Sequence, residues 1–134
     1  MSLVLISPTG RGIRGQDNWG SGAHNAPRGK RKHDGVDFIC KPGQKVQSPI
    51  YGRVVRVARP YVDSPYLGCL IANERLEIKL FYFKPDISVI GKDIKQGDYI
   101  GIAQDISIKY PGIVPHLHLQ ITNMDPNLLL RGEE

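Results

Sequence analysis

The sequence predicts a small, mainly β protein built on an antiparallel sheet, a sandwich or a barrel-like arrangement. No segment keeps apolar residues at a sustained period of 3.6, so little helix is expected. Short runs rich in Val and Ile are separated by turn signals, and the chain holds 15 glycines and 10 prolines. At 134 residues of ordinary hydrophobic and charged content, residues 1–134 are expected to form a single domain.

The first 32 residues differ from the remainder. Residues 9–32, TGRGIRGQDNWGSGAHNAPRGKRK, are rich in glycine with few apolar positions, which predicts a long N-terminal loop. Residues 1–32 carry six Lys and Arg against one Asp, which equals the net charge of +5 of the whole chain. Such a basic segment suits either contact with an anionic polymer or a solvated loop. No RNA-binding motif or recognition helix favours specific binding of nucleic acid.

From residue 33 onward the pattern is one of strands. The turn KPGQ separates the first two, and ANER divides a longer run into the two strands of a hairpin. In GRVVRVARP, Val55 and Val57 alternate onto one face. The predicted strand segments are GVDFIC (35–40), KVQSP (45–49), GRVVRVARP (52–60), CLIANERLEIKLFYF (69–83), KQGDYIGIAQDI (95–106) and PHLHLQITN (115–123).

Localisation signals are sparse. No apolar run approaches the ~20 residues of a transmembrane helix. The opening MSLVLISP is too short for a signal peptide. Cys40 and Cys69, the two cysteines, fit either one disulfide of a secreted protein or two buried thiols.

Two histidines, His116 and His118, lie one residue apart in PHLHLQI, residues 115–121. In a strand, residues i and i+2 share a face ~6–7 Å apart. Both imidazoles therefore face one way, while Leu117, Leu119 and Ile121 face a core. The pair fits a metal ligand or a catalytic base, or two polar residues on a solvated face.

A second cluster lies in HDGVDF, residues 33–38. In an extended segment His33, Gly35 and Asp37 share a face, and Gly35 would leave room for an ion between the imidazole and the carboxylate. Together with His116 and His118, this gives three imidazoles and one carboxylate. Two histidines with a carboxylate are a catalytic type of zinc site that keeps a position open for water. The remaining histidine could act as a base or stabilise an oxyanion.

HDGVD followed by HLH resembles the two signature motifs of the M23 peptidases, lysostaphin-like zinc endopeptidases that cut peptide cross-links in bacterial cell walls. SPTGRG, KPGQKVQSPIYGRVV and DIKQGDYIGI agree with the same family. The resemblance implies a β domain of the M23 type. It also implies Zn²⁺ ligands at His33, Asp37 and His118, with His116 as a catalytic histidine beside them.

The segment LFYFKP, residues 80–85, departs from the active enzymes of that family. Where they carry another catalytic histidine, this chain has Tyr82, or Phe83 one step away. The chain looks most like the leukocyte cell-derived chemotaxins, which also lack this histidine. The resemblance includes the segments HDGVDFICKPGQKV and YPGIVPHLHL. The chemotaxins are secreted animal members of the superfamily, regarded as zinc-binding signalling proteins. A phenol with a pKa of ~10 is a poor general base near neutrality.

The sequence thus predicts a secreted, zinc-binding protein of the M23 fold that is weakly catalytic or non-catalytic and binds a peptide, a glycan or a cell-surface protein. The alternative is an active zinc endopeptidase acting on bacterial cell-wall peptides, with His116 assisting. Arg11 or Arg14 would bind a substrate carboxylate or carry surface charge. Tyr110 would wall the ion site or simply pack. Neither the oligomeric state nor a specific partner follows from the sequence.

Overall fold

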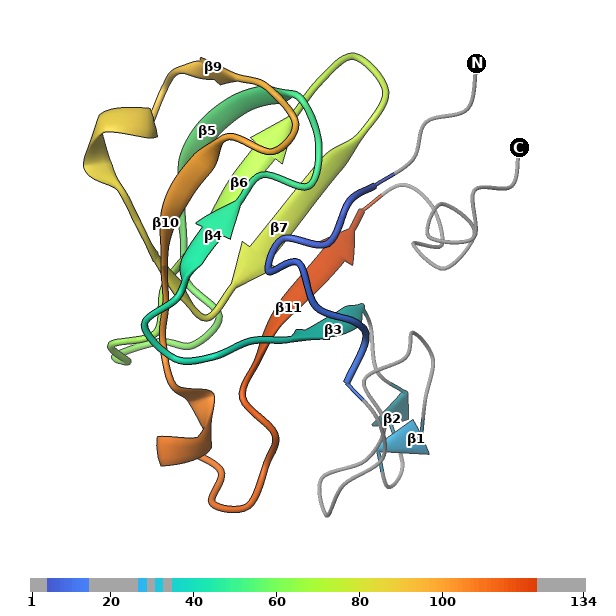
Figure 1. Ribbon diagram of the computed structural model, residues 1–134, viewed down its shortest axis with the longest axis vertical. Helices are drawn as coiled ribbons and strands as arrows, with labels where there is room; N and C mark the ends of the chain where they lie inside the picture. The colour runs from blue at the N-terminus through green and yellow to red at the C-terminus, as the bar shows by residue number, and fades with distance from the viewer. Residues whose placement is uncertain (1–4, 15–26, 29–30, 33–34, 123–134) are drawn as a thin grey trace.

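A computed structural model of the protein describes residues 5–14, 27–28, 31–32 and 35–122. Its strands form antiparallel sheets, and its only helical elements in these ranges are two 3₁₀ turns, η1 (Ile87–Val89) and η2 (Ile106–Ile108). The expectation of a mainly β fold with little helix is confirmed (Figure 1). The strands are β1 (Pro27–Arg28), β2 (Arg31–Lys32), β3 (Val36–Ile39), β4 (Lys45–Gln47), β5 (Gly52–Ala58), β6 (Gly68–Ala72), β7 (Glu77–Phe81), β8 (Phe83–Pro85), β9 (Asp93–Ile94), β10 (Tyr99–Ala103) and β11 (His116–Ile121).

The main sheet has the strand order β3-β11-β7-β6-β5-β9, and a smaller sheet has the order β4-β10-β8. The strands β1 and β2 pair with each other inside the stretch expected to be loop. In the same stretch, Ile13 forms a bridge with Phe38 of β3. These short pairings lie within a stretch predicted to be largely loop, and such backbone pairing needs no apolar repeat in the sequence.

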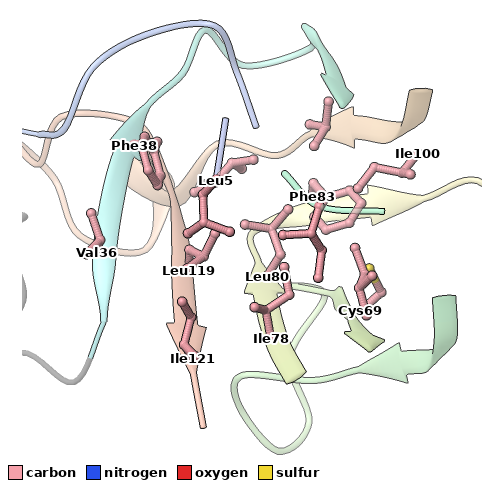
Figure 2. Close-up of a cluster of buried hydrophobic side chains, with 14 of the residues drawn as sticks. Leu5, Val36, Phe38, Cys69, Ile78, Leu80, Phe83, Ile100, Leu119 and Ile121 are labelled. Carbon is pink, nitrogen blue, oxygen red and sulfur yellow. The ribbon is translucent and has the colours of Figure 1, made fainter. Parts of the chain in front are cut away.

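The core lies between the two larger sheets (Figure 2). Strand β11 contributes Leu117, Leu119 and Ile121, the side chains that its alternation predicted to face inward. The small sheet contributes Val46, Ile100 and Phe83 from its three strands. Since period-two alternation sends the intervening residues of β11 to the opposite face, this core holds the two histidines in fixed positions.

The strand β5 keeps its predicted alternation despite a bulge. A bulge lies between Val54 and Arg56 in its pairing with β6. Val54 and Ala58 are buried, whereas Val55 and Val57 are 43% and 40% exposed. Val55 and Val57 therefore lie together on one face, as the alternation predicted, and that face is the outer one.

The hairpin predicted around ANER is present, with Ala72 opposite Glu77. The Asn73 carboxamide oxygen accepts hydrogen bonds from the backbone N–H groups of Arg75 and Leu76, which stabilises the turn. After β7 the chain crosses from the main sheet into β8 of the small sheet. Tyr82 lies at this crossing, with a φ of 78°.

Cys40 and Cys69 are both buried as free thiols, and of the two sequence interpretations the structure has the one without a disulfide. Burial raises the pKa of each thiol from 9.0 to about 12. Within the described ranges, no helix has the length and apolar character needed to cross a membrane.

Candidate functional site

The pairing of three strands sets the geometry of the candidate site. In the register of β3 with β11, Asp37 lies opposite His118. In the register of β11 with β7, His118 lies opposite Phe81. The rings of Phe81 and His118 stack with centroids 6.2 Å apart and an interplanar angle of 14°. The sheet thus brings together Asp37 and His118, which are 81 positions apart in the chain.

The Asp37 carboxylate is the centre of the site and is 1% exposed. Its Oδ1 lies 2.8 Å from Nδ1 of His118, and its Oδ2 lies 3.4 Å from Nε2 of His116. The structure therefore brings three of the predicted site residues, Asp37, His116 and His118, into direct proximity. Both histidines are buried, so the alternative of polar residues on a solvated face is wrong.

Arg14 completes the surroundings of this carboxylate. Its Nε donates to Oδ2 of Asp37 at 3.2 Å, and its Nη2 lies 3.1 Å from the same oxygen. The backbone N–H of Arg14 also donates to the Asp37 carbonyl at 2.7 Å. The guanidinium is fully buried, so both sequence interpretations of Arg14, substrate binding and surface charge, are wrong. No sequence pattern signalled this role, since an isolated Arg in a glycine-rich stretch is usually exposed.

Gly35 lies against the imidazole of His118. A Cβ at Gly35 would lie 2.4 Å from the Leu119 carbonyl oxygen and 2.8 Å from Nε2 of His118. The space that the absent side chain leaves is therefore filled by His118 itself, and not left open for an ion as the sequence suggested. With its Nε2 side packed on Gly35, His118 presents Nδ1 to the Asp37 carboxylate.

The His116 ring is oriented by its backbone neighbours. Its Nδ1 lies 2.7 Å from the Val114 carbonyl oxygen, which fixes the neutral ring as the Nδ1–H tautomer. Burial lowers the pKa of His116 from 6.5, and this effect exceeds the opposing influence of Asp37. Near neutral pH, His116 therefore carries an unprotonated Nε2 directed towards the Asp37 carboxylate.

Tyr82 stands beside His116, with ring centroids 5.5 Å apart at 81°. Its positive φ is uncommon for an aromatic residue and is typical of positions that the surrounding structure constrains. The backbone N–H of Tyr82 donates to the Leu67 carbonyl, and its own carbonyl accepts from Gln104. The crossing between the sheets thus aims the Tyr82 ring at His116.

The Tyr82 hydroxyl belongs to a chain of phenols that the sequence did not indicate. It lies 2.9 Å from the Tyr61 hydroxyl, which lies 3.0 Å from the Tyr110 hydroxyl. Burial and the two neighbouring phenols raise the pKa of Tyr61, so its phenol keeps its proton. The Lys109 ammonium lies 4.7 Å and 5.5 Å from the ring centroids of Tyr61 and Tyr110. These residues come from separate loops, so no local spacing could have revealed them.

The donor atoms of Asp37 and His118 are suited to a shared cation. Two ligand atoms of one tetrahedral Zn²⁺ lie ~3.3 Å apart, given bonds of ~2.0–2.1 Å. Oδ1 and Nδ1 need to separate only slightly from their 2.8 Å distance to reach this value. Among the residues described, no group of three His, Cys, Asp or Glu is arranged for a metal. The third predicted ligand, His33, lies outside the described residues.

Comparison with known proteins is consistent across sequence and structure. The family model described as "Peptidase family M23" matches residues 31–128. The chain is 32% identical over 130 residues to leukocyte cell-derived chemotaxin-2 of Mus musculus, covering 95% of this chain and 85% of that protein. It is 35% identical over 113 residues to myeloid protein 1 of Gallus gallus, covering 81% of this chain but 34% of that protein.

Solved structures share the fold. Helicobacter pylori Csd3 superposes with a TM-score of 0.66 at 23% identity, covering 97% of this chain and 34% of that one. Lysostaphin from Staphylococcus simulans, an antimicrobial peptidase, superposes with a TM-score of 0.65 at 24% identity, covering 98% of this chain and 55% of lysostaphin. The chain therefore spans only about a third to a half of these two proteins.

Proposed function

Because the chain belongs to peptidase family M23, we propose that it is a zinc-binding, chemotaxin-like member that acts by binding a peptide, glycan or cell-surface partner and hydrolyses peptide bonds weakly or not at all. The single observation that carries this proposal is the contact of Tyr82 with His116. A phenol occupies the place beside His116 where the family resemblance calls for a second imidazole. Secretion of the protein is part of the same proposal, on the strength of its chemotaxin relatives.

The proposed zinc ligands are His33, Asp37 and His118. The facing atoms Oδ1 and Nδ1, together with the packing of Gly35 on the far side of the His118 ring, support the last two. Arg14 holds the other carboxylate oxygen, which leaves Oδ1 as the donor. When bound, the metal would supply Lewis-acid activation of an oxygen ligand. One of the neighbours with the same fold is described as a zinc-containing peptidase from Vibrio cholerae.

Weak turnover follows from the chemistry of Tyr82. With its hydroxyl bonded to Tyr61, and a pKa of ~10 for an ordinary phenol, Tyr82 cannot take a proton near neutral pH. Its hydroxyl is directed at the Tyr61 hydroxyl and is therefore not positioned to donate a hydrogen bond to a reacting carbonyl. Loss of one donor to a developing oxyanion typically lowers a rate by ~10²–10³. The residues that remain suit binding better than rapid cleavage.

A second candidate, an active endopeptidase, is favoured by the state of His116. Its Nδ1 is held by the Val114 carbonyl, and its Nε2 is unprotonated at neutral pH. This is the arrangement of a general base. An enzyme of this kind would need His116 alone to move the proton, with Tyr82 acting at most as a hydrogen-bond donor.

Two measurements test the proposal. Metal analysis after reconstitution with zinc should find one ion per chain, with marked loss in Asp37→Ala and in His118→Ala. His116→Ala and the surface variant Asp93→Ala should retain the ion. Failure of the wild-type chain to bind zinc would refute the assignment.

Turnover is measured on peptidoglycan and on oligoglycine with zinc added. We expect no cleavage above background. Cleavage that disappears in His116→Ala would instead establish the endopeptidase.

A further inference from the structure

A cluster of tyrosines lies next to His116, and the ammonium of Lys109 lies against it. The proposed function gives this ammonium no role. Tyr61, Tyr82 and Tyr110 are linked through their hydroxyls, and Tyr66 packs edge-on against Tyr82 with centroids 6.0 Å apart. The ammonium of Lys109 lies over two of these rings. The cluster is assembled from the loop after β5, the β7–β8 crossing and the segment after η2.

The Lys109 ammonium is held in place but is not neutralised. Its side chain is exposed, and within the described part of the chain no carboxylate pairs with it. Contact with the faces of two tyrosine rings restricts a side chain that otherwise loses much rotamer freedom on binding. A cation fixed in this way can pair with an anion at a lower entropic cost than a mobile surface lysine.

The backbone under Lys109 is also fixed. The Tyr66 hydroxyl donates to the Asp105 carbonyl at 2.8 Å, and the Lys109 N–H donates to the Ile106 carbonyl. Ile106 and Ile113 are buried with Tyr66 in a small apolar cluster. The Asp105 carboxylate accepts from the N–H and hydroxyl of Ser107, so it is engaged within its own turn. The ammonium is thus presented from an ordered turn beside the candidate site.

The geometry points to a subsite in which Lys109, seated on Tyr61 and Tyr110, binds the carboxylate of a peptide ligand that extends from the His116 side. The assignment rests on the proposed function, because it takes the ligand of an M23-fold binding protein to be a peptide. The contact chain from Lys109 through Tyr61 and Tyr82 to His116 connects this subsite to Asp37 and His118. A carboxylate and an ammonium form a charge-assisted hydrogen bond, and ring faces and phenols favour an adjoining peptide backbone.

The test uses triglycine, which ends in a carboxylate, and triglycinamide, which does not. Each is titrated into the full chain and followed by NMR, first without added metal and then after reconstitution with zinc. We expect triglycine to bind about tenfold more tightly or better, because the amide removes the charged acceptor. The shifts should centre on Tyr61, Lys109 and Tyr110. Equal binding of the two peptides, or no binding of either, would overturn the subsite.

Variants locate the effect. Lys109→Met keeps most of the apolar stem and removes the charge, so it should abolish the preference for triglycine over the amide. Tyr61→Leu removes one ring face and should weaken the preference while its spectrum reports an intact fold. Lys92→Met changes an exposed lysine directly before β9; it is the matched control and should leave the preference unchanged.

Two further outcomes count against the subsite. A carboxylate preference that needs zinc but survives in Lys109→Met would place the carboxylate at Asp37 and His118. Tighter binding of glucuronate than of triglycine, lost in Lys109→Met, would assign the site to an acidic glycan and refute a peptide ligand. All these experiments measure ligand binding. Their failure can therefore be distinguished from a failure of the proposed function, which is tested by zinc content and by turnover.

Discussion

The guanidinium of Arg14 and the carboxylate of Asp37 form an ion pair removed from solvent, with side chains 0% and 1% exposed and Nη2 3.1 Å from Oδ2. A carboxylate at this depth would lose most of its hydration, and Arg14 supplies the compensating charge. Backbone hydrogen bonds hold residues 12–14 along the edge of β3: the Arg14 N–H donates to the Asp37 carbonyl, and the Ile39 N–H donates to the Gly12 carbonyl. Arg14 thus positions the central acid of the candidate site.

Replacing Arg14 with Met should destabilise the protein by about 3–5 kcal/mol at pH 7, because Asp37 would keep a buried charge with its main partner removed. Urea denaturation measures the change. The matched control is Arg53→Met, which breaks the exposed pair with Asp93 and should cost less than about 1 kcal/mol. Equal losses for the two variants would show that the Arg14 pair is not what the fold depends on.

Gly35→Ala should damage the site more than its single methyl group suggests. The new Cβ would meet the Leu119 carbonyl and the His118 ring, and the backbone of β11 moves little because it is paired with β3 on one side and β7 on the other. We expect a loss of about 1–3 kcal/mol in stability, together with weaker zinc binding in a competition assay with a chelator. Gly12→Ala is the control, because nothing lies within 4 Å of the added carbon. Unchanged zinc affinity in Gly35→Ala would argue against His118 as a ligand.

Tyr82→His tests whether the phenol limits turnover. Histidine is found at positive φ more readily than most side chains, so the variant should keep the backbone of the crossing. We expect hydrolysis of oligoglycine by the zinc-loaded variant to reach ~10²-fold or more above the background rate seen with the wild type. Tyr82→Phe, which removes the hydroxyl and with it the bond to Tyr61, should show no such rise. If Tyr82→His binds zinc normally and stays inactive, the replaced imidazole is not the cause of weak catalysis.

The cysteines offer a prediction on pH. Burial raises the pKa of Cys40 and Cys69 to about 12, so both thiols hold their protons in the folded state above pH 9, where the unfolded thiols ionise. Their contribution to stability is therefore present below pH 9 and is lost as the pH rises from 9 towards 12. Denaturation at pH 8 and pH 10, for the wild type and for Cys69→Ala, should show a smaller pH-dependent loss in the variant.

The same burial protects the thiols from reagents. Iodoacetamide at pH 8 should label neither cysteine until the chain is unfolded, when mass spectrometry should find two modified sites. Rapid labelling of Cys69 in the folded protein, or a mass that shows a disulfide, would contradict the structure.

Alternation in β11 was sufficient to predict which side chains face the core, because a period of two fixes the side on which each residue lies. Leu117, Leu119 and Ile121 therefore lie where the pattern placed them. In β5 the same rule correctly placed Val55 and Val57 on one face, which is the exposed one, but the residue types do not mark the bulge between Val54 and Arg56.

The candidate site could be predicted from the sequence only in part. Asp37, His116 and His118 belong to two short motifs whose residue types suggested a shared site, but their individual roles came from the family resemblance. Their proximity depends on the register of β3 on β11, which pairs residues far apart in sequence. Arg14 and Tyr61 reach the site from segments without a motif of their own. Their roles depend on burial and on the meeting of separate loops, which local spacing does not encode.

The crossing at Tyr82 has a consequence for how such proteins change over evolution. The backbone there is fixed by bonds to Leu67 and Gln104, and none of these bonds involves the Tyr82 side chain. Whatever residue stands at this position is therefore delivered to the same place beside His116. Gain or loss of an imidazole at the crossing is a single exchange that leaves the scaffold intact, so binding proteins and enzymes built on it can be one substitution apart.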